Sequence, residues 1–192
     1  ACSDFLDVAT QNGLDPDQAN DAERFCNAAY ASLMNQRDVK LWAWGDVRSD
    51  DAYKGGGGTN DGYTEHCYET GTHLVTTFNE PDGYWFAQYC GISRVNTALN
   101  ALNLVSEKEF PNKVTRQAEM RFLRGHFYFL LKILFKNIPF VDETVPEHQY
   151  QYISNVALTD VEMWDKIIED FKFAFDNLPE KQADLGRANK YA

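Results

Sequence analysis

The sequence lacks long apolar runs, and its basic residues are few and scattered. The most apolar window, FYFLLKILF (127–135), is interrupted by Lys132 and is far shorter than the ~20 residues that a membrane-spanning helix needs, so it predicts a buried helix. Lys and Arg number 18 against 29 Asp and Glu, for a formal net charge of −11. Because a nucleic-acid backbone is bound by clustered Lys and Arg, this distribution argues against a nucleic-acid partner.

Cysteine is also scarce and widely spaced. The four cysteines form no CxxC pair, which argues against a zinc ribbon and against a thioredoxin-type redox site. His66 and Cys67, with His73 and Cys90 farther along the chain, show no recognised metal-ligand spacing. We therefore expect neither a metal nor another cofactor.

Catalytic and phosphate-binding motifs are missing as well. The glycine run 55–58 follows Lys54, whereas a phosphate-binding P-loop has its Lys and Ser or Thr after the glycines. Asp50 and Asp51 could suggest a glycosidase, but neighbouring side chains normally point apart, and the two catalytic carboxylates must face one scissile bond. These observations favour a binding protein rather than an enzyme.

Helical periodicity is the main feature that the sequence does have. Apolar residues recur every three or four positions in four segments, which predicts four helices with apolar inner faces and a mostly α fold. The segments are 17–37, 81–102, 115–135 and 159–178. Thr159 and Glu162 form the sequence of a capping box at the start of the last one, and Pro179 ends it.

Two stretches show no such period. Residues 1–16 are polar, as in a tether, and residues 38–80 have the composition of a long irregular insertion. Insertions of this length in a compact domain often carry function. The glycine run within it predicts a mobile surface loop, since glycine restricts the backbone least.

The insertion combines aromatic and acidic side chains. Neutral sugars are bound by an aromatic ring against the apolar face of the sugar, while carboxylates take the hydroxyls in hydrogen bonds that contribute about 1.5–3 kcal/mol each. The candidate ligand-binding residues are Trp42, Trp44, Asp50, Asp51, Tyr53 and, at the start of the second helix, Trp85. Trp42 and Trp44 could instead anchor the insertion by packing, and Trp85 could face either the core or the ligand.

Four stretches, in this order, resemble the SusD/RagB family of outer-membrane nutrient-binding lipoproteins. They are CSDFLD (2–7), EMRFLRGHFYFLLKILFKNIPFVDE (119–143), IIEDFKFAFDNLPEK (167–181) and GRANKYA (186–192). The second is similar to that family's Glu-x-x-x-Leu-Arg-Ala helix, with Gly125 where Ala is usual and Lys136 where Gly is usual. Members of the family are longer, so the resemblance covers their N-terminal part.

The resemblance implies tetratricopeptide-type helix pairs, although the sequence has no clear repeat of about 34 residues. It implies that 1–16 is the tether of a lipoprotein lipidated at Cys2, and that 17–192 is the N-terminal part of a SusD-like helical domain. An ordinary terminal cysteine is the alternative for Cys2. The oxidising setting outside the cytoplasm would permit a Cys67–Cys90 disulfide, or one that involves Cys26.

By resemblance, the protein is expected on the cell surface, anchored in the outer membrane by its lipid. Its function would be to capture an oligosaccharide or polysaccharide and to deliver it to a SusC-like TonB-dependent transporter. Two alternatives stay open: a peptide-binding member of the same family, and a module that docks on the transporter without a ligand site of its own.

Overall fold

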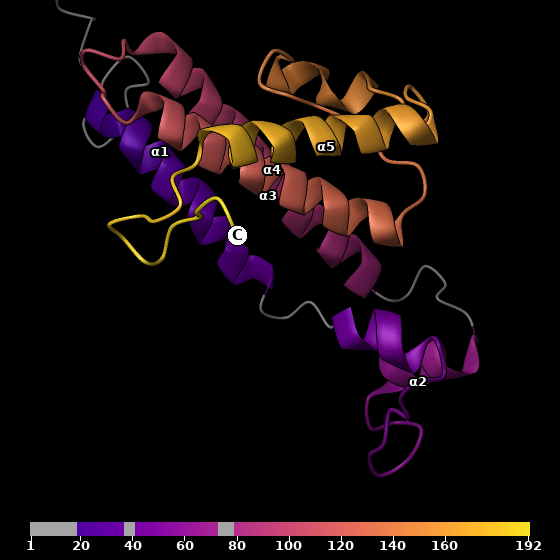
Figure 1. Cartoon of the computed structure of the whole chain (residues 1–192). Coiled ribbons are helices and arrows are strands. Elements are labelled where there is room, and N and C mark those ends of the chain that lie inside the picture. The colour runs from indigo at the N-terminus through magenta and orange to yellow at the C-terminus, as the bar shows by residue number, and fades with distance from the viewer. Residues whose placement is uncertain (1–18, 37–40, 73–78) are drawn as a thin grey trace, which may run out of the picture.

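The computed structural model describes residues 19–36, 41–72 and 79–192, and this part of the chain contains helices and no β-strand. Its body is made of the long helices α1 (Ala19–Ala31), α3 (Asn79–Leu104), α4 (Lys113–Leu134) and α5 (Asp160–Asn177) (Figure 1). Shorter segments are η1 (Ser32–Gln36), η2 (Ala43–Val47), α2 (Tyr63–Thr70) and η3 (Glu147–Tyr152). The expected mostly α fold is confirmed.

The core lies between α3 and its two neighbours. Helix α3 packs against α1 and α4, and α4 packs in turn against α5 (Figure 1). The predicted inner faces of 81–102 and 115–135 are confirmed, because their apolar residues are buried. Fully buried members include Ile92, Val95, Leu102, Leu123, Phe127 and Leu131. Burial of each such side chain stabilises the fold by about 1.5–3 kcal/mol.

The predicted ends of the last three helices agree with the structure to within two residues. The capping box of α5 is formed as expected: Glu162 N–H donates to Thr159 Oγ1 at 3.3 Å, and Thr159 N–H donates to Glu162 Oε2 at 2.7 Å. Pro81 lies in the first turn of α3, where its missing N–H costs no hydrogen bond.

The first helix ends earlier than the periodicity predicts. The α-helix stops at Ala31 and a tighter 3₁₀ segment follows, so Leu33 and Met34 are exposed rather than on the inner face. The buried hydroxyl of Ser32 donates to Ala28 O at 3.5 Å and accepts from Arg94 Nη1 at 3.2 Å. A serine hydroxyl that bonds to the preceding turn competes with the regular helical pattern.

On α5 the predicted inner face is too wide. Ile167, Ala174 and Leu178 are buried, but Ile168 and Phe175 are 58% and 53% exposed. The packing partner that the structure gives α5 is α4, so only the residues on that side are covered.

The prediction of irregular chain over 38–80 is wrong for part of the stretch. Residues 41–72, which we call the loop unit, contain the short π-helix η2 and the eight-residue helix α2. The two pack on each other and enclose a small core of Ala43, Val47 and Tyr68. Figure 1 shows the loop unit beside one end of the long-helix body.

A buried charge network connects the long helices. Arg124 on α4 donates from Nε and Nη2 to the carboxylate of Asp170 on α5 at 2.7 and 2.9 Å, and it also bonds Asn96 and Glu143. Burial alone would lower the pKa of Arg124, but Asp170 and Glu143 outweigh burial and raise the pKa above its ordinary value. The guanidinium therefore stays charged inside the protein.

The C-terminal segment is tied to α1 and α4 by Arg187. Its Nη1 donates to Glu119 Oε2 at 2.8 Å, its Nη2 donates to Asn27 at 2.8 Å, and it pairs with Glu23. The backbone N–H of Ala188 donates to Tyr30 Oη at 3.0 Å.

Gly125 lies on α4 where alanine is usual, and the packing of α4 gives a steric reason for the glycine. A Cβ atom at this position would lie 3.2 Å from the ring of Phe171 on α5. Glycine therefore allows α4 and α5 to approach closely at this point.

The expected disulfides are not formed. Cys26, Cys67 and Cys90 are free thiols, with Cys26 buried in the main core and Cys67 buried on α2, so the expectation of a bond among them is wrong. Burial also raises the pKa of Cys26 to about 12, which keeps its thiol protonated at neutral pH. Cys2 and the predicted tether 1–16 lie outside the described residues. None of the described helices combines the length and the apolar character needed to cross a membrane.

Candidate functional site

The loop unit carries most of the residues predicted to bind a ligand, and the structure separates them by exposure. Trp44 is half-buried and packs its ring 4.7 Å from the ring of Tyr68 and 6.3 Å from that of Tyr84 on α3. Trp44 thus fills the small core of the loop unit and connects it to the long-helix body. This is the packing role that the sequence left open for it.

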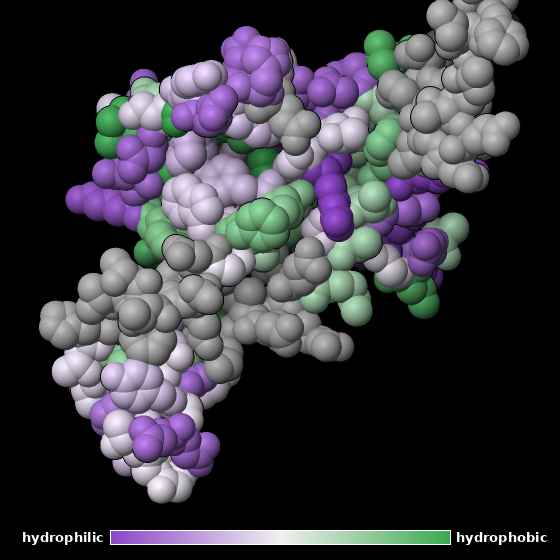
Figure 2. Space-filling view, turned by 180° about the vertical axis from the view of Figure 1, so that it is seen from behind, coloured by the Kyte–Doolittle hydropathy of each residue, from purple (hydrophilic) through white to green (hydrophobic). Residues whose placement is uncertain are grey.

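Trp42 and Tyr53 present exposed rings on the same unit. Trp42 is 48% exposed although it lies only two residues from Trp44, and Tyr53 is 80% exposed. An exposed aromatic ring can stack on the apolar face of a sugar, so these two side chains are the candidate platform. The face of the loop unit seen in Figure 2 is mostly hydrophilic, whereas green apolar patches lie over the long helices.

The acidic residues next to Tyr53 are exposed as well. Asp50 has φ 67°, in the left-handed region that non-glycine residues seldom adopt, and its carboxylate makes no hydrogen bond or ion pair with another described residue. Asp51 Oδ2 accepts from Ser49 Oγ at 3.0 Å, which leaves Oδ1 for an outside donor. Both carboxylates are therefore available to the hydroxyls of a ligand.

The glycine run has a more specific role than the mobile loop that the sequence predicts. It curves around Lys54, whose Nζ donates to the carbonyls of Gly55, Gly58 and Asp61 at 3.1, 2.9 and 2.7 Å. Asp61 Oδ2 accepts from Gly57 N–H at 2.7 Å. Gly55 and Gly56 have φ of 71° and 81°, which only glycine adopts readily, so the glycines allow the chain to close around the ammonium group.

Trp85 lies in the long-helix body. Its ring is 4.9 Å from that of Tyr89 and 5.0 Å from that of Phe135, so it packs at the edge of the main core. The sequence left open whether Trp85 faces the core or a ligand, and these contacts show that it packs on the core. Trp42, Asp50, Asp51 and Tyr53 are all exposed on the loop unit and remain the candidate site.

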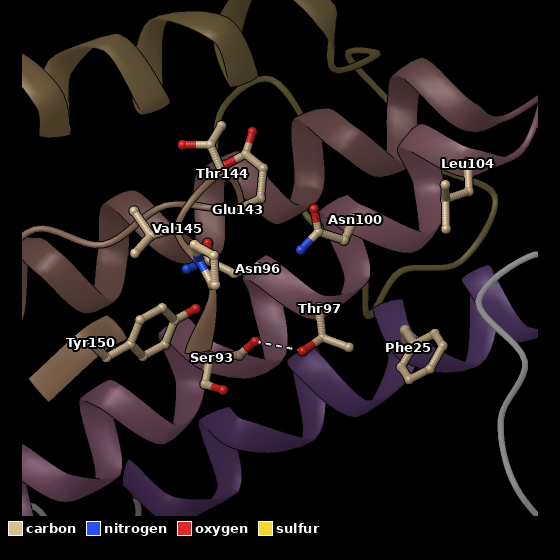
Figure 3. Close-up of a pocket in the computed structure, with 11 residues that line it drawn as sticks. Phe25, Ser93, Asn96, Thr97, Asn100, Leu104, Glu143, Thr144, Val145 and Tyr150 are labelled. Carbon is tan, nitrogen blue, oxygen red and sulfur yellow. Dashed lines mark hydrogen bonds between the residues drawn. The ribbon is translucent and has the colours of Figure 1, made fainter. Parts of the chain in front are cut away.

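The sequence analysis missed a groove beside α3. It has a volume of about 490 Å³, and we call it the α3 groove (Figure 3). Its lining residues are Phe25, Ser93, Asn96, Thr97, Asn100, Leu104, Glu143, Thr144, Val145, Pro146 and Tyr150. Polar residues at 93, 96, 97 and 100 lie on one helical face, and this spacing is the signal that the sequence offered.

Comparisons with known proteins agree on the fold. The model of a SusD-like family described as starch-binding and associating with the outer membrane matches residues 4–192. No curated protein sequence matches the chain.

Solved structures of SusD-like proteins superpose on the chain. A laminarin-binding SusD-like protein has a TM-score of 0.72 at 24% identity, over 90% of this chain and 37% of that one. Surface glycan-binding protein A from Bacteroides fluxus has a TM-score of 0.71 at 22% identity, over 90% and 37%. The same-named protein from Bacteroides thetaiotaomicron, in complex with laminarihexaose, has a TM-score of 0.67 at 19% identity, over 89% and 36%. The chain thus spans little more than a third of the length of these proteins.

Proposed function

This chain belongs to the SusD-like family described as starch-binding and associating with the outer membrane, and from that premise we propose that it is part of a cell-surface glycan-binding protein. In this proposal the loop unit captures an oligosaccharide, which the protein then delivers to a SusC-like TonB-dependent transporter. A lipid on Cys2 would hold the protein at the outer membrane, with residues 1–16 as the tether.

The observation that carries the proposal is that exposed aromatic rings and exposed carboxylates occur together on the loop unit. Trp42 and Tyr53 are 48% and 80% exposed, and Asp50 and Asp51 are exposed on the same stretch of chain between them. Stacking on the rings and hydrogen bonds to the carboxylates are the two interactions that an uncharged sugar needs. Glycan-binding proteins of similar fold give independent support.

Binding without catalysis is also part of the proposal. Asp50 and Asp51 are adjacent in the chain and both exposed, and they line neither the α3 groove nor two smaller pockets found among the described residues. A glycosidase needs two carboxyl groups on opposite sides of one bond, about 5–5.5 or 6.5–9.5 Å apart, inside a site that holds the sugar.

The experiment is affinity electrophoresis through gels that contain starch, laminarin or another polysaccharide, with the wild-type chain and two variants. We expect one polysaccharide to retard the wild type. Trp42→Ala and Tyr53→Ala should each weaken the retention, by roughly 2 kcal/mol or about 30-fold in Kd for an aromatic residue central to a binding site.

Tyr152→Ala is the matched control, because Tyr152 is 79% exposed but lies on η3, outside the loop unit. It should be retarded like the wild type. Migration of the wild type unchanged across the whole panel would refute glycan binding by this chain. Peptides would then be the next ligands to test, as the peptide-binding alternative requires.

A further inference from the structure

The α3 groove has the size and composition of a small-molecule site. Its volume of about 490 Å³ falls within the range of about 300–1,000 Å³ that is usual for such sites. It is bordered by α1, α3, the segment after α4 and η3. In Figure 3, Tyr150 and Phe25 lie at opposite ends of the row formed by Ser93, Asn96, Thr97 and Asn100.

Hydrogen bonds fix the buried side chain of Asn96, which lines the groove. Asn96 Nδ2 donates to Val141 O at 3.2 Å, and Asn96 Oδ1 accepts from Arg124 Nη1 at 3.1 Å. Arg124 also bonds Oε2 of Glu143 and is itself fixed by Asp170. Side chains locked in this way meet a ligand without losing further conformational freedom, which favours binding.

Several polar atoms of the groove are still available. Among the described residues, the hydroxyls of Ser93 and Tyr150, the amide of Asn100 and Oε1 of Glu143 have no hydrogen-bond partner. They offer both donors and acceptors along one wall. The dashed line in Figure 3 is the bond from Thr97 Oγ1 to Ser93 O at 2.9 Å, which uses the backbone and leaves the Ser93 hydroxyl free.

The charge of the groove suits an uncharged ligand. No Lys or Arg is among its lining residues, and its one carboxylate, Glu143, is paired with the buried guanidinium of Arg124. An anion would find no cation to pair with, and an added cation would compete with Arg124 for Glu143. Mixed donors and acceptors with a ring at each end are instead what a polyhydroxylated ring compound requires.

We propose that the α3 groove is a second binding site, for an uncharged sugar of mono- or disaccharide size. Asn100 and Tyr150 bind its hydroxyls, and Glu143 accepts one further hydrogen bond. This site does not depend on the loop unit or on the glycan-binding role proposed above for Trp42 and Tyr53.

The test is saturation-transfer NMR on the full chain with glucose, maltose and cellobiose as separate probes. We expect transfer to at least one of the three. Asn100→Ala and Tyr150→Phe, which remove polar groups without emptying the core, should each weaken the Kd by about tenfold, as expected for a lost hydrogen bond. Glucuronate should bind more weakly than glucose.

Two control variants separate this site from its surroundings. Asn103→Ala removes an exposed amide of α3 that does not line the groove, and it should bind like the wild type. Tyr152→Ala, which removes an exposed ring of η3 that does not line the groove, should also bind like the wild type. The proposal is overturned if none of the three sugars gives transfer, or if Asn100→Ala and Tyr150→Phe leave binding unchanged.

Discussion

Single residues decide how closely the helices approach and which side chains stay free. Gly91 on α3 has no Cβ, and the ring of Phe127 on α4 occupies the space where one would be. Trp42 and Trp44, two positions apart, differ in exposure: Trp44 contacts Tyr68 and Tyr84, whereas Trp42 is 48% exposed. Such differences depend on contacts far along the chain, so the sequence could name both tryptophans but could not separate them.

Gly91→Ala should destabilise the fold. The new Cβ would lie 2.7 Å from two atoms of the fully buried Phe127 ring, which has no room to move. Overpacking of about 1–3 kcal/mol exceeds the gain in helix propensity of about 0.5–1 kcal/mol, so we expect a net loss of about 1–2 kcal/mol in urea unfolding.

Gly83→Ala, on the same helix, is the matched control, since nothing lies within 4 Å of its added Cβ. This variant should be as stable as the wild type or more stable. Equal unfolding free energies for Gly91→Ala and the wild type would contradict the close approach of α3 and α4.

His126 gives the protein a pH-dependent stability. Partial burial lowers the pKa of His126 below its ordinary value near 6.5, so the folded state favours the neutral ring. The unfolded chain takes up a proton near pH 6.5 while the folded chain resists it. The stabilisation is therefore complete above about pH 6.5 and is lost as the pH falls below that value.

Urea unfolding of His126→Gln at pH 7.5 and pH 5.5 checks this effect. We expect the free energy of unfolding to fall with pH in both proteins, but by a smaller amount in the variant. An identical fall in the two proteins would mean that His126 does not contribute.

At the scale of elements, periodicity and stop signals were enough to locate the long helices. Apolar spacing, Pro81 and the capping box at Thr159 set the ends of α3 and α5 to within two residues. The helices η2 and α2 gave no such signal, because they are short and are stabilised mainly by contact with each other. The α3 groove was equally hidden, since Asn96 and Glu143 come together only when segments 47 residues apart fold side by side.

We expect the Lys54 ammonium group to order the glycine run 55–58. Lys54→Met removes a cation that three backbone carbonyls share, and no other described side chain replaces it. We expect amide hydrogen exchange in residues 55–61 to accelerate about tenfold, in line with the loss of a charged hydrogen bond. Exchange within α3 and α4 should not change.

Lys108→Met serves as the control, because Lys108 is exposed and makes no hydrogen bond or ion pair with a described residue. Its exchange pattern should match that of the wild type. Slow exchange in 55–61 of Lys54→Met would show that the glycine run holds its shape without the lysine.

In the molecule as described, a body of packed helices carries a smaller unit with exposed aromatic and acidic side chains. The buried ion pair of Arg124 and the partly buried pairs of Arg187 tie α1, α4, α5 and the C-terminal segment together. The Trp44–Tyr84 contact joins the loop unit to this body. A rigid scaffold that presents a binding surface on a short insertion is a common arrangement for recognition. Family membership fits this division, but it does not by itself locate the ligand.

The most direct test is therefore to map where a glycan binds. Amide NMR spectra of the ¹⁵N-labelled chain would be recorded during titration with maltohexaose and, separately, with laminarihexaose. Binding to the loop unit predicts that the largest shift changes from one of these ligands fall in residues 41–54 and include Trp42 and Tyr53. Changes confined to the long helices, or no change with either ligand, would contradict it.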